Sequence, residues 1–298
     1  MSHPTSSVTD SPGAAPAAVR LPDASHVGGL TLQVSDLTRS LAYYRDLLGL
    51  RVLDTGHDTA RLGVPGAEAP LVTLHSMPGT TPAGRRGSYG LFHFAILLPD
   101  RASLGRFIAH LSALGLRAGM SDHLVSEAIY LADPDGLGIE VYADRPRSTW
   151  RWEGGQLAMA TEPLDVRDLV TAAGNTAWSG MPAGATMGHM HLHVGDLEAA
   201  DRFYRHGLGF DLTTWGYPGA LFFSAGGYHH HLGANTWAPG PAPARDQAQL
   251  VEWTLVVPTP ADAALIGDRM AAAGVAVESA GDARLLRDPW GTRVRITA

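Results

Sequence analysis

The chain has 298 residues, of which 45% are apolar and 17% charged, which fits a compact globular protein of one large or two ordinary domains. Its formal net charge is −7 without any run rich in lysine and arginine, and no apolar stretch approaches the roughly 20 residues that span a bilayer, so neither nucleic acid nor a membrane is an expected partner. The chain has no cysteine, so a bound metal must be held by histidine and carboxylate groups, and we expect a cytoplasmic location.

The N-terminal segment 1–25 is rich in serine, proline and alanine. It lacks the charged and then apolar order of a signal peptide. We expect a disordered tail here, because so few large apolar residues cannot offset the entropy of ordering the backbone. The folded part of the chain is therefore expected to begin near residue 26.

A pattern of 24 residues occurs twice without a gap, as VGGLTLQVSDLTRSLAYYRDLLGL (27–50) and MGHMHLHVGDLEAADRFYRHGLGF (187–210). In the first copy, alternating apolar residues up to Val34 predict a half-buried strand. Asp36 then suits a helix N-cap, as does Asp196 in the second copy. Gly49 is suited to end the first helix. Each copy therefore predicts a strand followed by a helix.

A second kind of repeat starts at HFAILLPD (93–100) and at EWTLVVPT (252–259). Each copy predicts a strand, a helix (102–114 or 261–273) and an Asp-Pro-x-Gly turn that leads into a final strand. The chain thus divides into four strand–helix–strands units, at about 27–76, 90–143, 187–236 and 250–298. We group them into a first domain at 26–145 and a second at 187–298, joined by a linker at 146–186.

The copies keep their framework but differ at three positions where a metal ligand could lie. The final strand of the second unit reads DPDGLGIEV (133–141), whereas that of the fourth reads DPWGTRVRI (288–296). The metal-competent residue and its counterpart are, in turn, Glu140 and Arg295, His93 and Glu252, and His189 and Gly29. A salt bridge between Glu252 and Arg295 in the fourth unit would fill the space where the second unit could bind a metal.

Four such units in about 300 residues resemble the vicinal oxygen chelate superfamily, which includes glyoxalases, extradiol ring-cleavage dioxygenases and small drug-binding proteins. The opening pattern LTLQVSDLTRSLAYYRDLLGL carries the resemblance, which extends over the chain after residue 26. It implies an α+β fold of four βαβββ modules, paired into curved, cup-forming mixed sheets. In that superfamily the metal ligands come from the first and last strands of a module.

The same resemblance implies that His93, His189 and Glu140 are the metal ligands. They would meet between the second and third units, whereas well-known two-domain extradiol enzymes use their third and fourth modules. Two imidazoles and one carboxylate, with open positions on one face, are typical of non-haem Fe(II) oxygenases. We therefore expect Fe(II), and Mn(II) would accept the same ligands.

The segment SDHLVSEAIYLADPDGLGIE (121–140) is similar to the extradiol dioxygenase signature of histidine, an apolar residue with tyrosine, an Asp-Pro-x-Gly turn and glutamate. It departs from the signature only at Ser121. The similarity implies that Glu140 ligates iron, that Tyr130 hydrogen-bonds the substrate, and that His123 lines the pocket. A core aromatic role for Tyr130 and a solvated loop position for His123 are the plainer alternatives.

The stretch GGYHHHLGANTW (226–237) contains three consecutive histidines. In a strand, His229 and His231 would point to one face and His230 to the other. A similar His-His pair in extradiol enzymes implies that His230 is the acid–base residue, although a shift by one residue would exchange the roles. We assign His229, His231 and Trp237 to substrate binding.

These resemblances imply an Fe(II)-dependent extradiol dioxygenase of the catechol 2,3-dioxygenase type. It would cleave a catechol-type ring with O2 next to the vicinal diol, with His230, Tyr130 and His123 as catalytic residues. Its partners would be a small aromatic diol and O2, and exposed sheet edges favour a homo-oligomer. Two alternatives stay open: a glyoxalase-like metal-dependent isomerase or lyase, and a non-catalytic small-molecule binding protein of the same fold.

Overall fold

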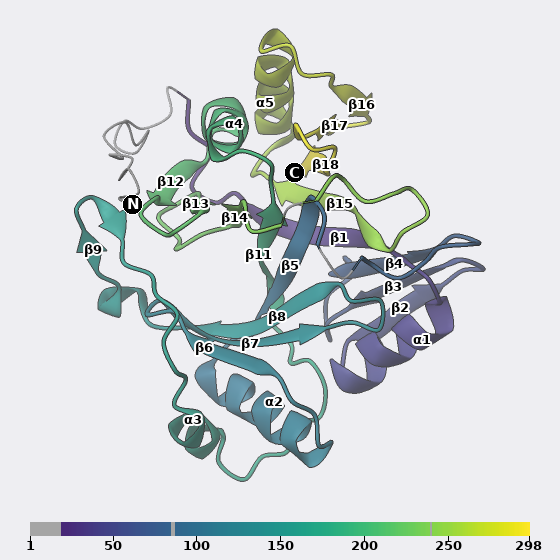
Figure 1. Ribbon diagram of the computed structural model, residues 1–298, viewed down its shortest axis with the longest axis vertical. Helices are drawn as coiled ribbons and strands as arrows, with labels where there is room; N and C mark the ends of the chain where they lie inside the picture. The colour runs from purple at the N-terminus through teal and green to yellow at the C-terminus, as the bar shows by residue number, and fades with distance from the viewer. Residues whose placement is uncertain (1–18, 85–86, 239) are drawn as a thin grey trace, which may run out of the picture.

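The computed structural model describes residues 19–84, 87–238 and 240–298. Within these ranges the chain forms four units, each with a strand, a helical segment and three further strands (Figure 1). The observed units differ from the predicted boundaries by at most one residue. The predicted α+β class and the βαβββ modules are therefore confirmed.

The first unit contains β1 (His26–Val34), α1 (Leu37–Ala42), η1 (Tyr43–Leu47), β2 (Arg51–Thr55), β3 (Thr59–Gly63) and β4 (Val72–Ser76). The second contains β5 (Gly90–Leu97), α2 (Arg101–Ala113), β6 (Gly119–Asp122), β7 (Ser126–Ala132) and β8 (Gly138–Asp144). The third contains β11 (Thr186–His193), α4 (Leu197–Ala200), η3 (Asp201–Leu208), β12 (Asp211–Thr214), β13 (Ala220–Ser224) and β14 (Leu232–Asn235). The fourth contains β15 (Gln249–Val256), α5 (Pro260–Ala272), β16 (Glu278–Ala280), β17 (Ala283–Arg287) and β18 (Arg293–Thr297).

The helical segments of units one and three begin and end at the predicted residues. The side chains of Asp36 and Asp196 each accept a hydrogen bond from the backbone N–H three residues further on, as N-caps do. Gly49 and Gly209 end the segments with positive φ angles of 77° and 94°, which glycine adopts at little cost. Both segments change after their first turn into wider π-helical turns, η1 and η3, which the regular helical spacing did not predict.

The strands form two eight-stranded mixed sheets. The first has the order β16-β17-β18-β15-β1-β4-β3-β2 and joins units four and one, and the second has the order β12-β13-β14-β11-β5-β8-β7-β6 and joins units three and two. Within each sheet, the opening strands of the two units pair antiparallel, β1 with β15 and β5 with β11. Figure 1 shows β5 and β11 side by side near the centre of the molecule. The last strand of each unit lies parallel to its first.

The sheets cross the predicted division into two domains, because each sheet takes one unit from either side of it. Units one and two, and likewise units three and four, are joined by a different contact. The Tyr44 hydroxyl of unit one donates to Asp133 in the Asp-Pro-Asp-Gly turn of unit two (3.1 Å). The Tyr204 hydroxyl of unit three donates to Asp288 in the corresponding turn of unit four (2.7 Å). Both groupings thus have specific contacts, and the domain boundaries stay a prediction.

The segment before β1 is partly ordered. Residues 1–18 of the expected disordered tail lie outside the described residues. Residues 19–25 differ from that expectation: Leu21 is buried, its N–H donates to the Gly209 carbonyl (2.7 Å), and Arg20 forms an ion pair with Asp211. The physical reason is that Leu21 packs into the hydrophobic core beside unit three. A prediction from composition does not consider such a tertiary contact.

The segment between units two and three carries short elements of its own, η2 (Arg147–Thr149), β9 (Trp152–Glu153), β10 (Gln156–Leu157) and α3 (Val166–Ala173). Helix α3 packs against α2, and both lie at the same end of the molecule in Figure 1. The Gln156 side chain accepts hydrogen bonds from the backbone of Trp215 (3.0 Å) and Gly216 (2.7 Å), which ties the segment to unit three. Among the described residues, none of the helices is both long and apolar enough to span a membrane.

Replacing Tyr44 by phenylalanine is expected to destabilise the fold. The change removes the hydrogen bond to Asp133, a carboxyl group that is itself buried, and leaves that group with one partner fewer. We expect the free energy of unfolding to fall by about 1–3 kcal/mol, measured by urea denaturation. Tyr43→Phe is the matched control, because no hydrogen bond of the Tyr43 hydroxyl occurs among the described residues. Equal losses in both variants would contradict the assigned role of this contact.

Candidate metal centre

The register of the second sheet brings four residues into one row across four strands. His189 on β11 pairs with Ala95 on β5, Ala95 with Glu140 on β8, and Glu140 with Tyr130 on β7. Because side chains alternate along a strand, His93 on β5 lies on the same face as Ala95. The small side chain of Ala95 leaves space between its larger neighbours. The side chains of Glu140 and His189 can therefore meet over Ala95, which lies between them in the sheet.

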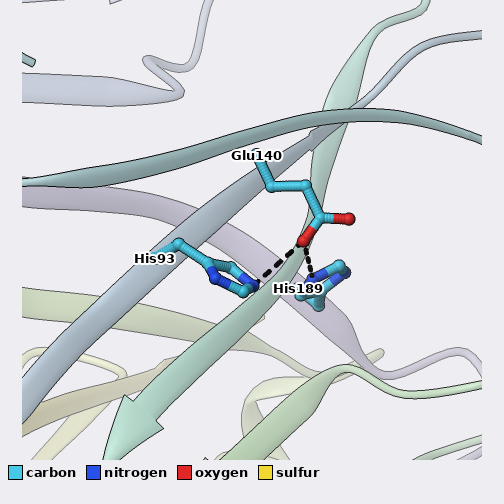
Figure 2. Close-up of side chains that lie close together, drawn as sticks. All are labelled: His93, Glu140 and His189. Atoms are coloured by element: carbon cyan, nitrogen blue, oxygen red, sulfur yellow. Dashed lines mark hydrogen bonds and ion pairs between the residues drawn. The ribbon is translucent and has the colours of Figure 1, made fainter. Parts of the chain in front are cut away.

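Three of these side chains converge, as predicted (Figure 2). His93 Nε2 lies 3.0 Å and His189 Nε2 lies 3.2 Å from the same carboxylate oxygen, Oε2 of Glu140. All three residues are buried. In the described part of the chain, they form a group whose potential ligand atoms lie within 4.8 Å of one another. Two histidines and one carboxylate, from two different units, thus form a candidate metal site.

The surroundings hold these groups in the charge states that a metal requires. Burial lowers the pKa of His93 and of His189, and the nearby Glu140 only partly offsets this. Burial by itself would raise the pKa of Glu140, but the two imidazoles outweigh it and hold that pKa well below its usual range. Near neutral pH the site therefore presents two neutral imidazoles and a carboxylate, all with lone pairs available for a cation.

Two ring nitrogen atoms of the site lack hydrogen-bond partners among the described residues. His93 Nε2 is buried and makes no hydrogen bond within the described residues, although Glu140 is close, because the direction of the ring does not suit an N–H···O bond. His189 Nδ1 is likewise buried without a partner. Burying polar atoms without partners is costly. A cation at the convergence point would provide a partner for Nε2 of His93, so the residues present fit a metal ion.

The sister sheet carries a salt bridge at the corresponding place. Arg295 Nε lies 2.6 Å from Glu252 Oε1, and Arg293 Nε lies 3.3 Å from the other oxygen of Glu252. Gly29 stands where the third unit has His189, and it lines the same cavity of about 590 Å³ as Glu252 and Arg295. The salt bridge expected from the sequence is confirmed. The guanidinium groups of Arg293 and Arg295 bind the Glu252 carboxylate, which a cation would need as a ligand.

The candidate metal site opens into a cavity of about 260 Å³. Four of the residues predicted for catalysis or substrate binding line it, namely Tyr130, His123, His230 and Trp237. The other lining residues are Phe92, His93, Ser121, Glu140, Met159, Thr161, His189, His191, Tyr217 and Phe222. The wall opposite the ligands is thus largely aromatic and apolar, and suits a small aromatic ring.

Tyr130 and His123 are joined in a chain that ends on a backbone carbonyl. His123 Nδ1 lies 2.6 Å from the carbonyl oxygen of Ala160, which can only accept a hydrogen bond, so Nδ1 carries the hydrogen. His123 Nε2 is then an acceptor for the Tyr130 hydroxyl, 2.5 Å away. The lone pairs of that hydroxyl are left for the cavity. Burial raises the pKa of Tyr130 well above its usual value, so the phenol keeps its hydrogen.

The three consecutive histidines do not lie in a strand, contrary to the sequence-based expectation. They precede β14 and lie in the connection after β13, where a period of two does not apply. Only His230 lines the cavity, with its ring centroid 4.1 Å from that of His189. His229 is buried behind His230, and His231 Nδ1 accepts a hydrogen bond from the Ala225 N–H (3.1 Å). Neither His229 nor His231 lines the cavity, so their assignment to substrate binding stays a prediction without a supporting position.

Several cavity residues were missed by sequence reasoning. His191 was detectable, because it lies two residues after His189 and must share its face of β11. It is buried, its Nε2 has no hydrogen-bond partner within the described residues, and its ring centroid is 4.9 Å from that of His93. Met159 and Thr161 carried no signal, because they belong to the segment between units two and three.

Comparison with known proteins agrees with this architecture. The family model described as the Glyoxalase/Bleomycin resistance protein/Dioxygenase superfamily matches residues 25–141 and 186–296. The two matches cover more than half of the chain, which therefore belongs to this superfamily. The catechol-2,3-dioxygenase of Bacillus subtilis (strain 168) is 42% identical over 270 residues, which cover 89% of this chain and 94% of that protein.

Two crystal structures illustrate the fold. A protein from Bacillus subtilis superposes with a TM-score of 0.66 at 14% identity, over 93% of this chain and 86% of the other. Glyoxalase I from Zea mays superposes with a TM-score of 0.52 at 18% identity, over 92% of both chains. At these identities the likeness concerns the fold alone.

Removing the shared carboxylate is expected to abolish metal binding. In Glu140→Ala the two imidazoles lose the anionic ligand between them, and we expect the affinity for Fe(II) to fall by more than about 100-fold. The measurement is anaerobic equilibrium dialysis followed by metal analysis. Glu252→Ala is the matched control, because it removes the carboxylate of the sister sheet, which stands at the position of His93, and it should retain the metal. Undiminished binding in Glu140→Ala would contradict the assignment of the site.

The buried His231 is expected to make the fold sensitive to acid. Burial lowers the pKa of His231 to about 3, whereas a histidine in the unfolded chain has a pKa of about 6.5. As the pH falls through this interval, the unfolded state binds the proton first, so stability is lost between about pH 6.5 and pH 3. His231→Gln should therefore flatten the decline of stability with acid.

Urea denaturation midpoints between pH 4 and pH 7 test this expectation. Replacing the exposed His57 by glutamine serves as the control and should leave the slope unchanged. Equal slopes for wild type and His231→Gln would refute the prediction.

Proposed function

We propose that this protein is an extradiol dioxygenase that cleaves a catechol-type ring with O2 next to the vicinal hydroxyl groups. The observation that carries the proposal is the group His93, His189 and Glu140, buried at the end of a largely aromatic cavity. Its support from comparison is the 42% identity with a catechol-2,3-dioxygenase over 94% of that protein.

In this proposal His93, His189 and Glu140 hold an Fe(II) ion, for which two imidazoles and a carboxylate are a suitable set. Mn(II) fits the same ligands, and metal analysis of the active protein distinguishes the two. When bound, such a cation supplies Lewis acidity, which lowers the pKa of a hydroxyl group that it coordinates. The remaining work falls to side chains of the cavity.

His230 is the proposed acid–base residue. Burial, and then the neighbouring His189, lower its pKa well below the ordinary value, so the imidazole is neutral and holds a lone pair to which a diol hydroxyl can donate. Tyr130 is held by His123, and its hydroxyl lone pairs can accept a hydrogen bond from a substrate hydroxyl. The rings of Phe92 and Trp237 have their centroids 5.6 Å apart. They would border the aromatic ring of the substrate at the exposed side of the cavity.

The proposed substrates are a small aromatic diol and O2, and the cavity of about 260 Å³ suits a single substituted ring. A homo-oligomeric state and a cytoplasmic location stay predictions from the sequence. A glyoxalase-like isomerase would commonly use a fourth protein ligand, and the described residues contribute three to this group.

The activity is tested with anaerobically purified, Fe(II)-loaded protein and catechol, following oxygen uptake and the yellow ring-cleavage product. His230→Gln should lower kcat by about 10²–10⁴-fold, because general acid–base catalysis contributes that much, while the metal content stays that of the wild type. His206→Gln, at a half-exposed position remote from the cavity, should be fully active. Turnover of a methylglyoxal–thiol adduct without oxygen uptake would overturn the proposal in favour of an isomerase.

A further inference from the structure

A chain of hydrogen bonds leads from the cavity to a partly exposed carboxylate behind His230. The Nδ1 atoms of His230 and His229 lie 2.7 Å apart, and His229 Nε2 lies 3.0 Å from Asp144 Oδ1. The His229 side chain is fully buried, whereas that of Asp144 is 28% exposed. His229 does not line the cavity, and its hydrogen bond to the lining residue His230 connects it to that space.

When each of the two imidazoles carries one hydrogen, these contacts select one arrangement of the hydrogen atoms. A carboxylate only accepts hydrogen bonds, so the hydrogen between His229 and Asp144 belongs to His229 Nε2. With one hydrogen on each ring, the other nitrogen of His229, Nδ1, carries a lone pair, and His230 donates to it from its own Nδ1. The remaining nitrogen of His230, Nε2, is therefore an acceptor.

We propose that Asp144, acting through His229, is a positioning residue that holds His230 in the Nδ1–H tautomer. In this tautomer Nε2 of His230 is free to take a proton from a bound diol. The catalytic meaning of the inference rests on the proposed function, but the tautomer itself is a property of this chain alone. His229 thus acts behind the acid–base residue, and not on the substrate as its position in sequence suggested.

The fold places Asp144 for this role. Glu140, Tyr142 and Asp144 alternate along β8 and therefore share one face of the sheet, so the strand that supplies the carboxylate of the metal site also supplies Asp144 at its end. The Tyr228 hydroxyl donates to the same Oδ1 of Asp144 (3.1 Å), and the Tyr142 hydroxyl lies 2.7 Å from that of Tyr228. Because Tyr228 gives its one hydrogen to Asp144, it accepts the hydrogen of Tyr142.

Among the described residues, Asp144 is the hydrogen-bond partner of His229 Nε2 that distinguishes the two tautomers of His229. If His229 carried its hydrogen on Nδ1, its Nε2 lone pair would face the Asp144 oxygen at 3.0 Å, which is repulsive. Removing Asp144 removes that repulsion and also the hydrogen bond that favours the Nε2–H tautomer of His229. His230 would then be free to carry its hydrogen on Nε2, where it blocks proton acceptance from the diol.

Nuclear magnetic resonance can read the tautomers directly. The full-length chain, labelled with ¹⁵N-histidine and loaded with diamagnetic Zn(II), is observed by multiple-bond ¹H–¹⁵N correlation. His229→Gln and His230→Gln assign the two signals. We expect hydrogen on Nδ1 of His230 and on Nε2 of His229 in the wild-type protein. Hydrogen on Nε2 of wild-type His230 would overturn the proposal, whatever the variants do.

Two substitutions of Asp144 then test its role. Asp144→Ala removes the acceptor and should shift His230 towards the Nε2–H tautomer. Asp144→Asn keeps an oxygen acceptor in place and should retain the wild-type tautomers, a rescue that a purely structural role of the charge would not predict. Asp54→Ala, which removes an exposed carboxylate that pairs with Arg61, is the matched control and should change neither signal. An unchanged His230 tautomer in Asp144→Ala would also refute the proposal.

Kinetics of the Fe(II)-loaded protein separate this inference from the proposed function. Asp144→Ala should lower kcat for catechol by about tenfold or more, a part of what acid–base catalysis contributes, with KM nearly unchanged. Wild-type protein that shows the expected tautomers but cleaves no catechol would overturn the dioxygenase proposal and leave the positioning role intact. An active wild type with the opposite tautomers would do the reverse.

Discussion

The buried carboxylate of Glu140 is the group on which the arrangement of the second sheet depends. An ionised carboxylate in a protein interior costs several kcal/mol unless other groups compensate it. Here the compensating groups are His93 and His189, which belong to different units of the chain. They reach the carboxylate only because β5 pairs with β11 on one side and with β8 on the other. The site therefore requires units two and three to share a sheet.

The two sheets show the same framework with different contents. In the second sheet the carboxylate of Glu140 faces two imidazoles, whereas in the first the carboxylate of Glu252 faces the guanidinium group of Arg295. Strand order, parallel and antiparallel pairings and the Tyr–Asp contacts between units are alike in both. The fold thus tolerates either arrangement, because each one gives the carboxylate polar partners, and only the imidazoles offer lone pairs to a cation.

The polar groups around the cavity are oriented from outside it. The Ala160 carbonyl fixes the hydrogen of His123 and so turns the lone pairs of Tyr130 towards the cavity. On the other side, Asp144 has the same relation to His230 through a buried imidazole. In both chains an oxygen that can only accept sets the direction of the hydrogen bonds. The cavity consequently presents acceptors, which suits a substrate that arrives with its hydroxyl hydrogens in place.

The sequence by itself determined the four units, their caps and the identity of the metal-competent residues, because these follow from local periodicity and from the contrast between copies, as with Glu140 and Arg295. It did not determine which units share a sheet, since a strand's own pattern says which face is buried but not which strand lies beside it. It also placed the three histidines in a strand, whereas they lie in the connection between β13 and β14. Only the tertiary structure decided that His230 faces the cavity and that His229 joins it to Asp144, since those contacts link segments that are 85 residues apart in sequence.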